Sequence, residues 1–163
     1  MGIEIERKFL LHEKAGASWK DGASSTYYCQ GYLSREKNCT VRVRIGGGNG
    51  WLSIKGANTG AVRLEYEYAI PCTEALELLQ NMAQHPLIEK NRYIIPYAGH
   101  IWEVDEFLGE NTGLIVAEVE LHSEEEAVEL PPWAGREVTG DPRYYNSNLI
   151  EQPFSLWKSD NGS

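Results

Sequence analysis

Like-charged residues two positions apart recur along this chain, and they constrain its fold more than any other feature of the sequence. Six such pairs stand in segments whose other residues are mostly apolar. They are Glu4/Glu6, Arg42/Arg44, Glu65/Glu67, Lys90/Arg92, Glu103/Asp105 and Glu118/Glu120. Because side chains on a β-strand alternate between two faces, each pair shares one face of a predicted strand, and the apolar residues share the other.

The alternation predicts eight strands, bounded by Gly, Pro or Asn residues or by a break in the pattern. We expect these strands at residues 3–9, 27–33, 40–45, 51–55, 62–68, 88–95, 100–107 and 114–121. Strands therefore dominate, and no βαβ rhythm appears, which favours an α+β chain built on an antiparallel sheet or barrel. The length of 163 residues is typical of one domain, and we expect residues 1–163 to form a single domain.

Helices are expected to be few. Thr73 is the predicted N-cap of a helix that runs to His85 and stops at Pro86. The segment Ser123–Glu126 has the form of a capping box, so a short helix is predicted to start there and to end before the two prolines at 131 and 132. Two further segments, residues 12–26 and 146–156, are expected to be loops with short helical turns.

The composition excludes several classes of protein. The net charge of −9 is the reverse of the basic excess usual in a DNA-binding protein. No apolar run is long enough to cross a bilayer, and the acidic start is unlike a secretory signal, so we expect a cytoplasmic protein that binds neither nucleic acid nor membrane. Three cysteines without C-x-x-C spacing and four histidines without paired spacing argue against a disulfide framework and a zinc site.

The charged faces indicate how the sheet is arranged. Residues two apart on a strand lie ~7 Å from each other, so a like-charge pair costs roughly 2 kcal/mol at an effective dielectric of 20 and much less in water. A solvated face is the ordinary explanation for one strand, but six such pairs favour a closed barrel whose charged faces line a tunnel. The apolar faces then point outward and form the hydrophobic core beneath the helices. The outward set is Ile3, Ile5, Val41, Val43, Leu52, Ile54, Leu64, Tyr66, Val104, Val119 and Leu121.

The predicted lumen carries charges of both signs. Its acids are Glu4, Glu6, Glu65, Glu67, Glu103, Asp105, Glu118 and Glu120. Its bases are Lys8, Arg42, Arg44, Lys55, Arg63, Lys90 and Arg92. Carboxylate oxygens suit Mg²⁺ or Mn²⁺, and arginine suits phosphate oxygens. A phosphate chain with roughly four to five negative charges, together with two divalent cations, would leave this lumen nearly neutral. The sequence therefore predicts a metal-bound polyphosphate as the ligand.

The order of these residues resembles the CYTH domains, also called triphosphate tunnel metalloenzymes. Glu4-Ile5-Glu6-Arg7-Lys8 matches their E-x-E-x-K signature. The later matches are Gln30-Gly31-Tyr32-Leu33, Arg42-x-Arg44, Lys55, Glu65-x-Glu67, Lys90-x-Arg92, Asp105, Glu118-x-Glu120 and Glu137-Val138-Thr139-x-Asp141-x-Arg143-Tyr144. The resemblance spans nearly the whole chain, whose length is similar to that of the short bacterial inorganic triphosphatases. It implies an eight-stranded antiparallel closed β-barrel with a charged lumen and a few helices packed outside.

The resemblance also implies roles for individual residues. Two ions, Mg²⁺ or Mn²⁺, would be held by Glu4, Glu6, Glu65, Glu67, Asp105, Glu118 and Glu120. Phosphate would be bound by Lys8, Arg42, Arg44, Lys55, Arg63, Lys90, Arg92 and Arg143. The catalytic candidates are Lys8, Lys55, Lys90 and Tyr32. Proton transfer would fall to Lys55 or Lys90 with help from Tyr32, for which an ordinary strand aromatic is the alternative.

Four positions have a structural role as an alternative or as the expectation: Arg143 and three tryptophans. Family members often carry Lys where this chain has Arg143, and a surface arginine near a turn is the alternative there. For the three tryptophans Trp51, Trp102 and Trp133 we expect packing on the outer face of the barrel.

The activity implied is the divalent-metal-dependent hydrolysis of a triphosphate, with tripolyphosphate giving pyrophosphate and phosphate. A class IV adenylyl cyclase, which shares the E-x-E-x-K start, and a thiamine triphosphatase are the alternative enzymes. A polyphosphate-binding module is the alternative that is not an enzyme. In every case the expected partner is a small-molecule triphosphate, and a homodimer is left open.

Overall fold

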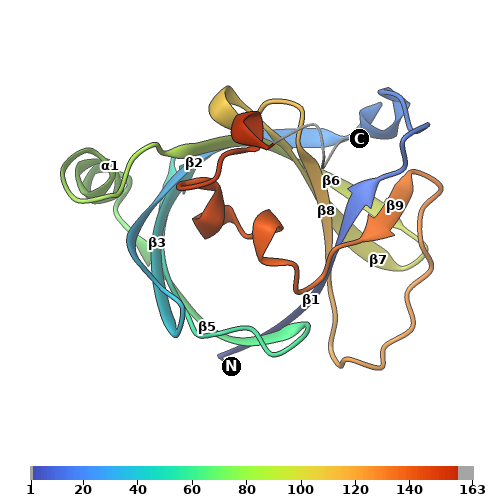
Figure 1. Cartoon of the computed structure of the whole chain (residues 1–163), viewed down its shortest axis with the longest axis horizontal. Coiled ribbons are helices and arrows are strands. Elements are labelled where there is room, and N and C mark those ends of the chain that lie inside the picture. Colours follow the sequence, from blue (N-terminus) through green and yellow to red (C-terminus); the bar gives the residue numbers. More distant parts are fainter. Residues whose placement is uncertain (1, 158–163) are drawn as a thin grey trace.

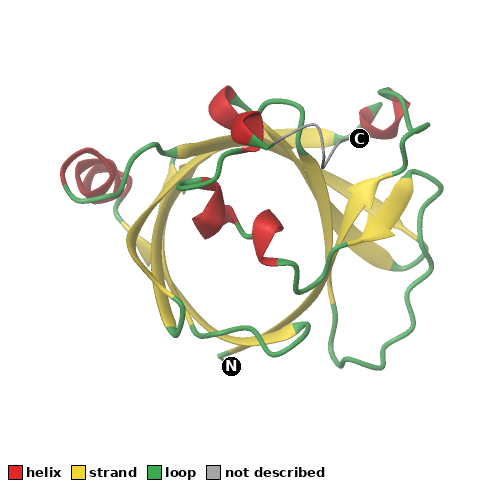
Figure 2. Ribbon diagram, in the orientation of Figure 1, coloured by secondary structure: helices red, strands yellow, loops and turns green. Residues whose placement is uncertain are grey.

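The computed structural model describes residues 2–157 and shows an antiparallel sheet rolled into a barrel (Figures 1 and 2). The strands are β1 (Ile3–Leu11), β2 (Ser24–Glu36), β3 (Cys39–Gly46), β4 (Asn49–Lys55), β5 (Val62–Ile70), β6 (Ile88–Tyr97), β7 (His100–Phe107), β8 (Ile115–Glu120) and β9 (Ala134–Glu137). All eight predicted strands are present. Among the described residues, no helix is long and apolar enough to span a membrane.

The sheet closes because β1 pairs with strands on both of its edges. The hydrogen-bonded order is β5-β4-β3-β2-β6-β7-β8-β1, and β1 also pairs with β5, where Ile3 lies opposite Leu64. Eight strands therefore form the closed barrel that was predicted. β9 is an additional strand that pairs with β1 at Phe9 and Leu11. Its residues, Ala-Gly-Arg-Glu, have no apolar alternation, so this strand was not predicted.

The α-helix of the described chain, α1 (Cys72–Asn81), packs on the outside of the barrel. Its Ala75 and Leu79 form a buried cluster with Val43 of β3. The remaining helical pieces are short 3-10 turns: η1 (Ser18–Lys20), η2 (Gly109–Asn111), η3 (Pro142–Tyr144), η4 (Asn146–Leu149) and η5 (Phe154–Leu156). Short helical turns were predicted within residues 12–26 and 146–156, where η1, η4 and η5 lie.

The ends of α1 differ from the prediction. Pro71, with an extended backbone, is the N-cap, so Thr73 lies inside the helix and caps nothing. The helix ends at Asn81 rather than His85, because the backbone N–H of Gln84 donates to the Tyr32 carbonyl of β2 at 2.9 Å instead of extending the helix.

The prediction of a short helix that starts at Ser123 and ends before Pro131 is wrong. One turn forms, in which the Glu126 backbone N–H donates to the Ser123 carbonyl at 3.2 Å, and the segment then continues without regular structure. In a capping box the glutamate would accept from the Ser123 N–H. Here the Glu126 carboxylate accepts from the His122 N–H at 2.6 Å and lies 2.7 Å from His100 Nε2 of β7, so its contacts are with β7 and the preceding turn instead of the Ser123 N–H.

The outer face of the barrel is only partly covered. Val104 and Val119 are fully buried outside the barrel, in a cluster with Trp102 that the segments flanking β1 and β9 complete. Ile3 and Leu64 point outward as predicted but are 60% and 52% exposed, so the predicted cover is absent over β5 and the start of β1.

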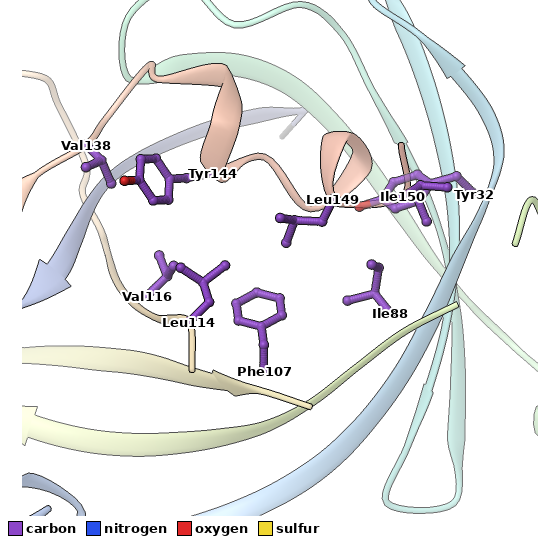
Figure 3. Packing of buried hydrophobic residues seen from close by; sticks show 9 residues of the cluster. All are labelled: Tyr32, Ile88, Phe107, Leu114, Val116, Val138, Tyr144, Leu149 and Ile150. Carbon is purple, nitrogen blue, oxygen red and sulfur yellow. The ribbon is translucent and has the colours of Figure 1, made fainter. Parts of the chain in front are cut away.

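A second hydrophobic core lies inside one end of the barrel, where none was predicted. The inward positions there are apolar: Tyr32 of β2, Ile88 of β6, Phe107 of β7, Leu114 and Val116 at β8. Three tail residues, Tyr144, Leu149 and Ile150, pack onto them, as Figure 3 shows, and the tail turns lie within the outline of the barrel in Figure 1. The tail therefore fills one end of the lumen.

Candidate active site

The two sides of the barrel present opposite charges to the lumen. Around the barrel, the neighbouring strands β7, β8, β1 and β5 carry the inward carboxylates. Most of the inward cations lie on β4 and β3 and, beyond β2, on β6. We call the first set the acidic half: Glu4, Glu6, Glu65, Glu67, Glu103, Glu118 and Glu120. We call the second set the basic half: Arg42, Arg44, Lys55, Lys90 and Arg92.

Two lysines form ion pairs with carboxylates of the acidic half. Lys8 Nζ lies 3.3 Å from Glu118 Oε2, because Lys8 and Glu118 face each other across the β1–β8 pairing. Lys55 Nζ lies 3.3 Å from Glu4 Oε1 and 3.4 Å from Glu65 Oε2. Lys8 thus contacts a carboxylate on the neighbouring strand, while Lys55 of β4 contacts carboxylates on the neighbouring β5 and on β1 beyond it.

The acidic half has more negative charge than these lysines balance. Burial, together with the charges of Glu118 and Glu4, raises the pKa of Glu6 to about 8. Burial and the neighbouring Glu4 also raise the pKa of Glu120. Since Glu118 and Glu4 add to the effect of burial, a cation bound on this side would favour the ionised form of Glu6.

The basic half has the reverse imbalance. Burial and the charges of Arg42 and Arg92 lower the pKa of Arg44 to about 9. Burial likewise lowers the pKa of Lys90 to about 7, since the attraction of Asp105 is opposed by Arg92 and Arg44. The Nε of Arg42 is buried and has no hydrogen-bond partner among residues 2–157. An anion bound here would relieve the repulsion and supply the missing acceptor.

Asp105 sits behind the basic half and holds two of its cations in place. Arg92 donates to both carboxylate oxygens, at 2.7 and 2.9 Å, and Lys90 Nζ lies 2.8 Å from Oδ2. Burial opposes the charged carboxylate, but Arg92 and Lys90 outweigh it and hold the pKa of Asp105 far below its ordinary value. Since both oxygens are occupied and Asp105 is 2% exposed, this residue orients Arg92 and Lys90 rather than facing the lumen.

The lumen is a cavity of about 630 Å³. Fourteen of the predicted site residues line it: Glu4, Glu6, Lys8, Tyr32, Arg42, Arg44, Lys55, Arg63, Glu65, Glu67, Lys90, Arg92, Glu118 and Glu120. Glu103, which was predicted to face the lumen, lines it as well. The alternation in the sequence thus brought residues from all eight strands of the barrel to one cavity.

Arg143 and Asp105 are the two predicted site residues that do not line this cavity. Arg143 Nη2 lies 3.0 Å from Asp141 Oδ2, and its guanidinium stacks over the Tyr144 and Trp157 rings. The side chain is therefore engaged with the tail, which agrees with the alternative of an arginine near a turn.

Trp51 lies inside the barrel, so its predicted outward packing is wrong. Trp102 and Trp133 do pack outside, with their ring centroids 5.6 Å apart. Trp51 lines the cavity, and its ring lies 6.1 Å from that of Tyr28. The signal was present in the sequence, because Trp51 has the same strand parity as the inward Lys55.

Several other lining residues were missed. Tyr28 alternates with the inward Tyr32 and could have been found from parity. His100 comes from the start of β7, while Tyr145 and Asn146 come from the tail and follow no strand period. Asn146 contacts the site directly: its Oδ1 accepts from Lys90 Nζ at 2.8 Å and from Gln30 Nε2 at 3.1 Å.

The carboxylates of the acidic half fit a hard divalent cation by donor type. Among the described residues, however, no three Asp, Glu, His or Cys side chains converge closely enough to form a complete metal site. Mg²⁺ is often bound by one or two carboxylates, with substrate phosphates and water completing its coordination. The excess negative charge around Glu6 is consistent with that kind of site.

This combination of a closed antiparallel barrel and a charged lumen with an E-x-E-x-K first strand defines a family. The CYTH domain model matches residues 2–147, and the chain belongs to this family. The chain is 50% identical over 158 residues to a protein of Acetivibrio thermocellus named inorganic triphosphatase, covering 97% of this chain and 99% of that one. It is 37% identical over 152 residues to a protein of the same name from Nitrosomonas europaea, covering 90% and 95%.

A solved structure agrees with the barrel. The crystal structure of an inorganic triphosphatase superposes with a TM-score of 0.63 at 33% sequence identity, over 94% of this chain and 98% of that chain. A putative adenylate cyclase from Bacillus halodurans superposes with a TM-score of 0.56 at 16% identity, over 97% and 94%, which shows likeness of fold alone.

Proposed function

We propose that this protein is a divalent-metal-dependent inorganic triphosphatase, which hydrolyses tripolyphosphate to pyrophosphate and phosphate. The observation that carries the proposal is the opposite imbalance of the two halves of one cavity. Burial and the charges of Glu118 and Glu4 raise the pKa of Glu6, and burial and the charges of Arg42 and Arg92 lower the pKa of Arg44. A polyphosphate bound through divalent cations relieves both at once. Two near relatives that carry the name inorganic triphosphatase support the same reading.

The binding roles follow from the two halves. We assign phosphate binding to Lys8, Arg42, Arg44, Lys55, Arg63, Lys90 and Arg92, and keep Arg143 as a more distant candidate. We assign metal binding to Glu4, Glu6, Glu65, Glu67, Glu118 and Glu120, with Asp105 acting through Arg92 and Lys90. Two bound Mg²⁺ or Mn²⁺ ions would supply neutralisation of phosphate charge and a means of orienting water.

The chemical step would use the enclosed cations of the lumen. Arginine and lysine donors that are already in place stabilise the charge developing on the transferred phosphoryl group without reorganising. Lys90, with a pKa lowered to about 7, is suited to giving or taking a proton near neutral pH. Lys55 and Lys8, held among carboxylates, are the other lysine candidates. The Tyr32 hydroxyl accepts from Gln30 Nε2 at 3.5 Å, and its part in proton transfer stays a prediction.

A substrate panel tests the proposal. The purified protein is incubated with tripolyphosphate, ATP or thiamine triphosphate, each with Mg²⁺ and with Mn²⁺, and orthophosphate and cyclic AMP are measured. We expect orthophosphate and pyrophosphate in equal amounts from tripolyphosphate, at the highest kcat/KM of the panel. Cyclic AMP from ATP would establish the cyclase, and faster cleavage of thiamine triphosphate would establish that hydrolase. Tight calorimetric binding of tripolyphosphate without turnover would identify a binding module.

A cytoplasmic location and a homodimer also stay predictions. Sedimentation equilibrium tests the homodimer.

A further inference from the structure

The tail places one amide in contact with the basic half. Asn146, at the start of η4, lines the cavity, and its Oδ1 accepts from Lys90 Nζ at 2.8 Å and from Gln30 Nε2 at 3.1 Å. Gln30 is fully buried, and its own Oε1 accepts from Arg44 Nε at 2.9 Å. A chain of hydrogen bonds therefore runs from the tail to two cations of the basic half.

These contacts fix the orientation of the Asn146 amide. An ammonium group has only donors, so the atom facing Lys90 must be the amide oxygen. With Oδ1 turned toward Lys90 and Gln30, the Nδ2 group points to the other side of the amide. Asn146 is half-buried, and its Nδ2 makes no hydrogen bond within residues 2–157. The two N–H donors of Nδ2 are therefore available to a bound molecule.

The surroundings determine what such a molecule is. Arg44 and Lys90 are both linked to the Asn146 amide, and Arg92 shares Asp105 with Lys90. An acceptor drawn into a region with this excess of cations is an anion. We infer that Asn146 is a further substrate-binding residue, whose Nδ2 donates to an oxygen of the phosphate that lies nearest the filled end of the lumen. This inference rests on the proposed function, since it takes the anion to be the end of a triphosphate chain.

The alternative is that Asn146 only anchors the tail. The apolar contacts of Tyr144, Leu149 and Ile150, which are all buried in the end of the barrel, already do this. We therefore expect the tail to remain folded when Asn146 is changed. The neighbouring Asn148 offers a matched control in the same turn, because its Nδ2 donates to the Pro142 carbonyl at 2.8 Å on the exposed side.

The experiment compares N146A, N146D and N148A with the unmodified protein. Aspartate keeps an oxygen that can accept from Lys90 and Gln30 but has no Nδ2 donor. We expect N146A and N146D each to raise KM for Mg²⁺-tripolyphosphate by about tenfold or more, the range for a hydrogen bond to a charged group. The inhibition constant of the non-hydrolysable analogue imidotriphosphate should rise by a similar factor, kcat should change less than KM, and Tm should stay near that of the unmodified protein.

Three results would overturn the inference. They are an unchanged KM in N146A, a KM in N146D close to that of the unmodified protein, and an equal rise in KM in N148A, which would mean that tail anchoring alone matters. If the unmodified protein releases no orthophosphate, the proposed function fails by itself. Calorimetric titration of tripolyphosphate into the same variants then still decides whether Asn146 binds the anion. A Kd about tenfold weaker in N146A supports the inference, and an unchanged Kd contradicts it.

Discussion

Replacing Asp105 with asparagine tests whether the charges of the lumen are enclosed as the structure has them. The Asp105 carboxylate accepts two hydrogen bonds from Arg92 and lies 2.8 Å from Lys90 Nζ. Asp105 is 2% exposed, Arg92 is 8% exposed and Lys90 is 1% exposed. Asparagine has nearly the same shape, so it leaves no cavity. It removes the carboxylate that contacts buried Lys90 and leaves Arg92 with only Glu103 at 3.1 Å and Glu118 at 3.8 Å. Breaking a buried ion pair in this way costs about 3–5 kcal/mol of unfolding free energy.

The assay is urea unfolding at pH 7, with thermal unfolding as a second measure. For a chain of this size each kcal/mol corresponds to about 2–4 °C in Tm, so the variant should melt roughly 6–20 °C lower. The control is E106Q, the next residue on β7, which points outward and lies 3.2 Å from Lys20 at the partly exposed surface. A surface pair of this kind contributes less than about 1 kcal/mol.

The pH dependence of D105N provides an independent check. The folded-state pKa of Asp105 is depressed below its unfolded value of about 4, so its contribution is present in full above that pH and is lost as the pH falls further. The difference in stability between D105N and the unmodified protein should widen as the pH falls below about 7, because Asp105 helps Lys90, whose pKa is about 7, to keep its proton. It should narrow below about pH 4, where Asp105 itself becomes protonated in the unfolded state. A loss under about 1 kcal/mol at pH 7, equal to that of E106Q, would refute the reasoning, because Arg92 and Lys90 would then be balanced by solvent and the remaining carboxylates.

Three further predictions concern the acidic half and the tail. E4Q and E118Q should each lower kcat for tripolyphosphate at least about 10²-fold, the scale of losing one electrostatic element, and unchanged turnover in a phosphate-release assay would exclude these residues as metal ligands. Because the pKa of Glu6 is raised to about 8, binding of Mn²⁺ at pH 7 should release a proton, and the affinity for Mn²⁺ should increase from pH 6 to pH 8. Calorimetric titration in buffers of different ionisation enthalpy measures the proton release, and a binding enthalpy that does not depend on the buffer would contradict this prediction. L149A should lose about 2–5 kcal/mol in urea unfolding, whereas L156A, at a position 60% exposed, should lose little; equal losses would mean that the tail core is not closed.

Strand alternation predicted the barrel and most of the cavity because a closed sheet turns every second residue to the same side. Glu4 and Glu6 on β1 and Glu118 and Glu120 on β8 are far apart in the sequence, yet one periodicity places them all in the lumen. The same rule applied to Trp51 would have placed it inside as well. The prediction of outer-face packing for Trp51 is wrong because its parity with Lys55 points inward.

The sequence could not predict the filled end of the barrel, because 3-10 turns have no sustained period. Leu149 and Ile150 form part of the inner core, but their spacing in the tail indicates neither a strand nor an amphipathic helix. The position of Asn146 depends on that packing, so its contact with Lys90 follows from the tertiary structure alone. The helix predicted at Ser123 does not form for a similar reason, since Glu126 contacts His100, which lies in a separate segment of the chain.

The central claim is that one enclosed lumen binds a metal–polyphosphate complex between an acidic and a basic half. A crystal structure of the protein with Mn²⁺ and imidotriphosphate measures this directly, through the anomalous signal of the metal. The account predicts Mn²⁺ beside Glu4, Glu6 and Glu118, with phosphate oxygens on the basic half at Arg42 and Arg44. Metal and triphosphate bound on the outside of the barrel, with the lumen holding only water, would contradict it.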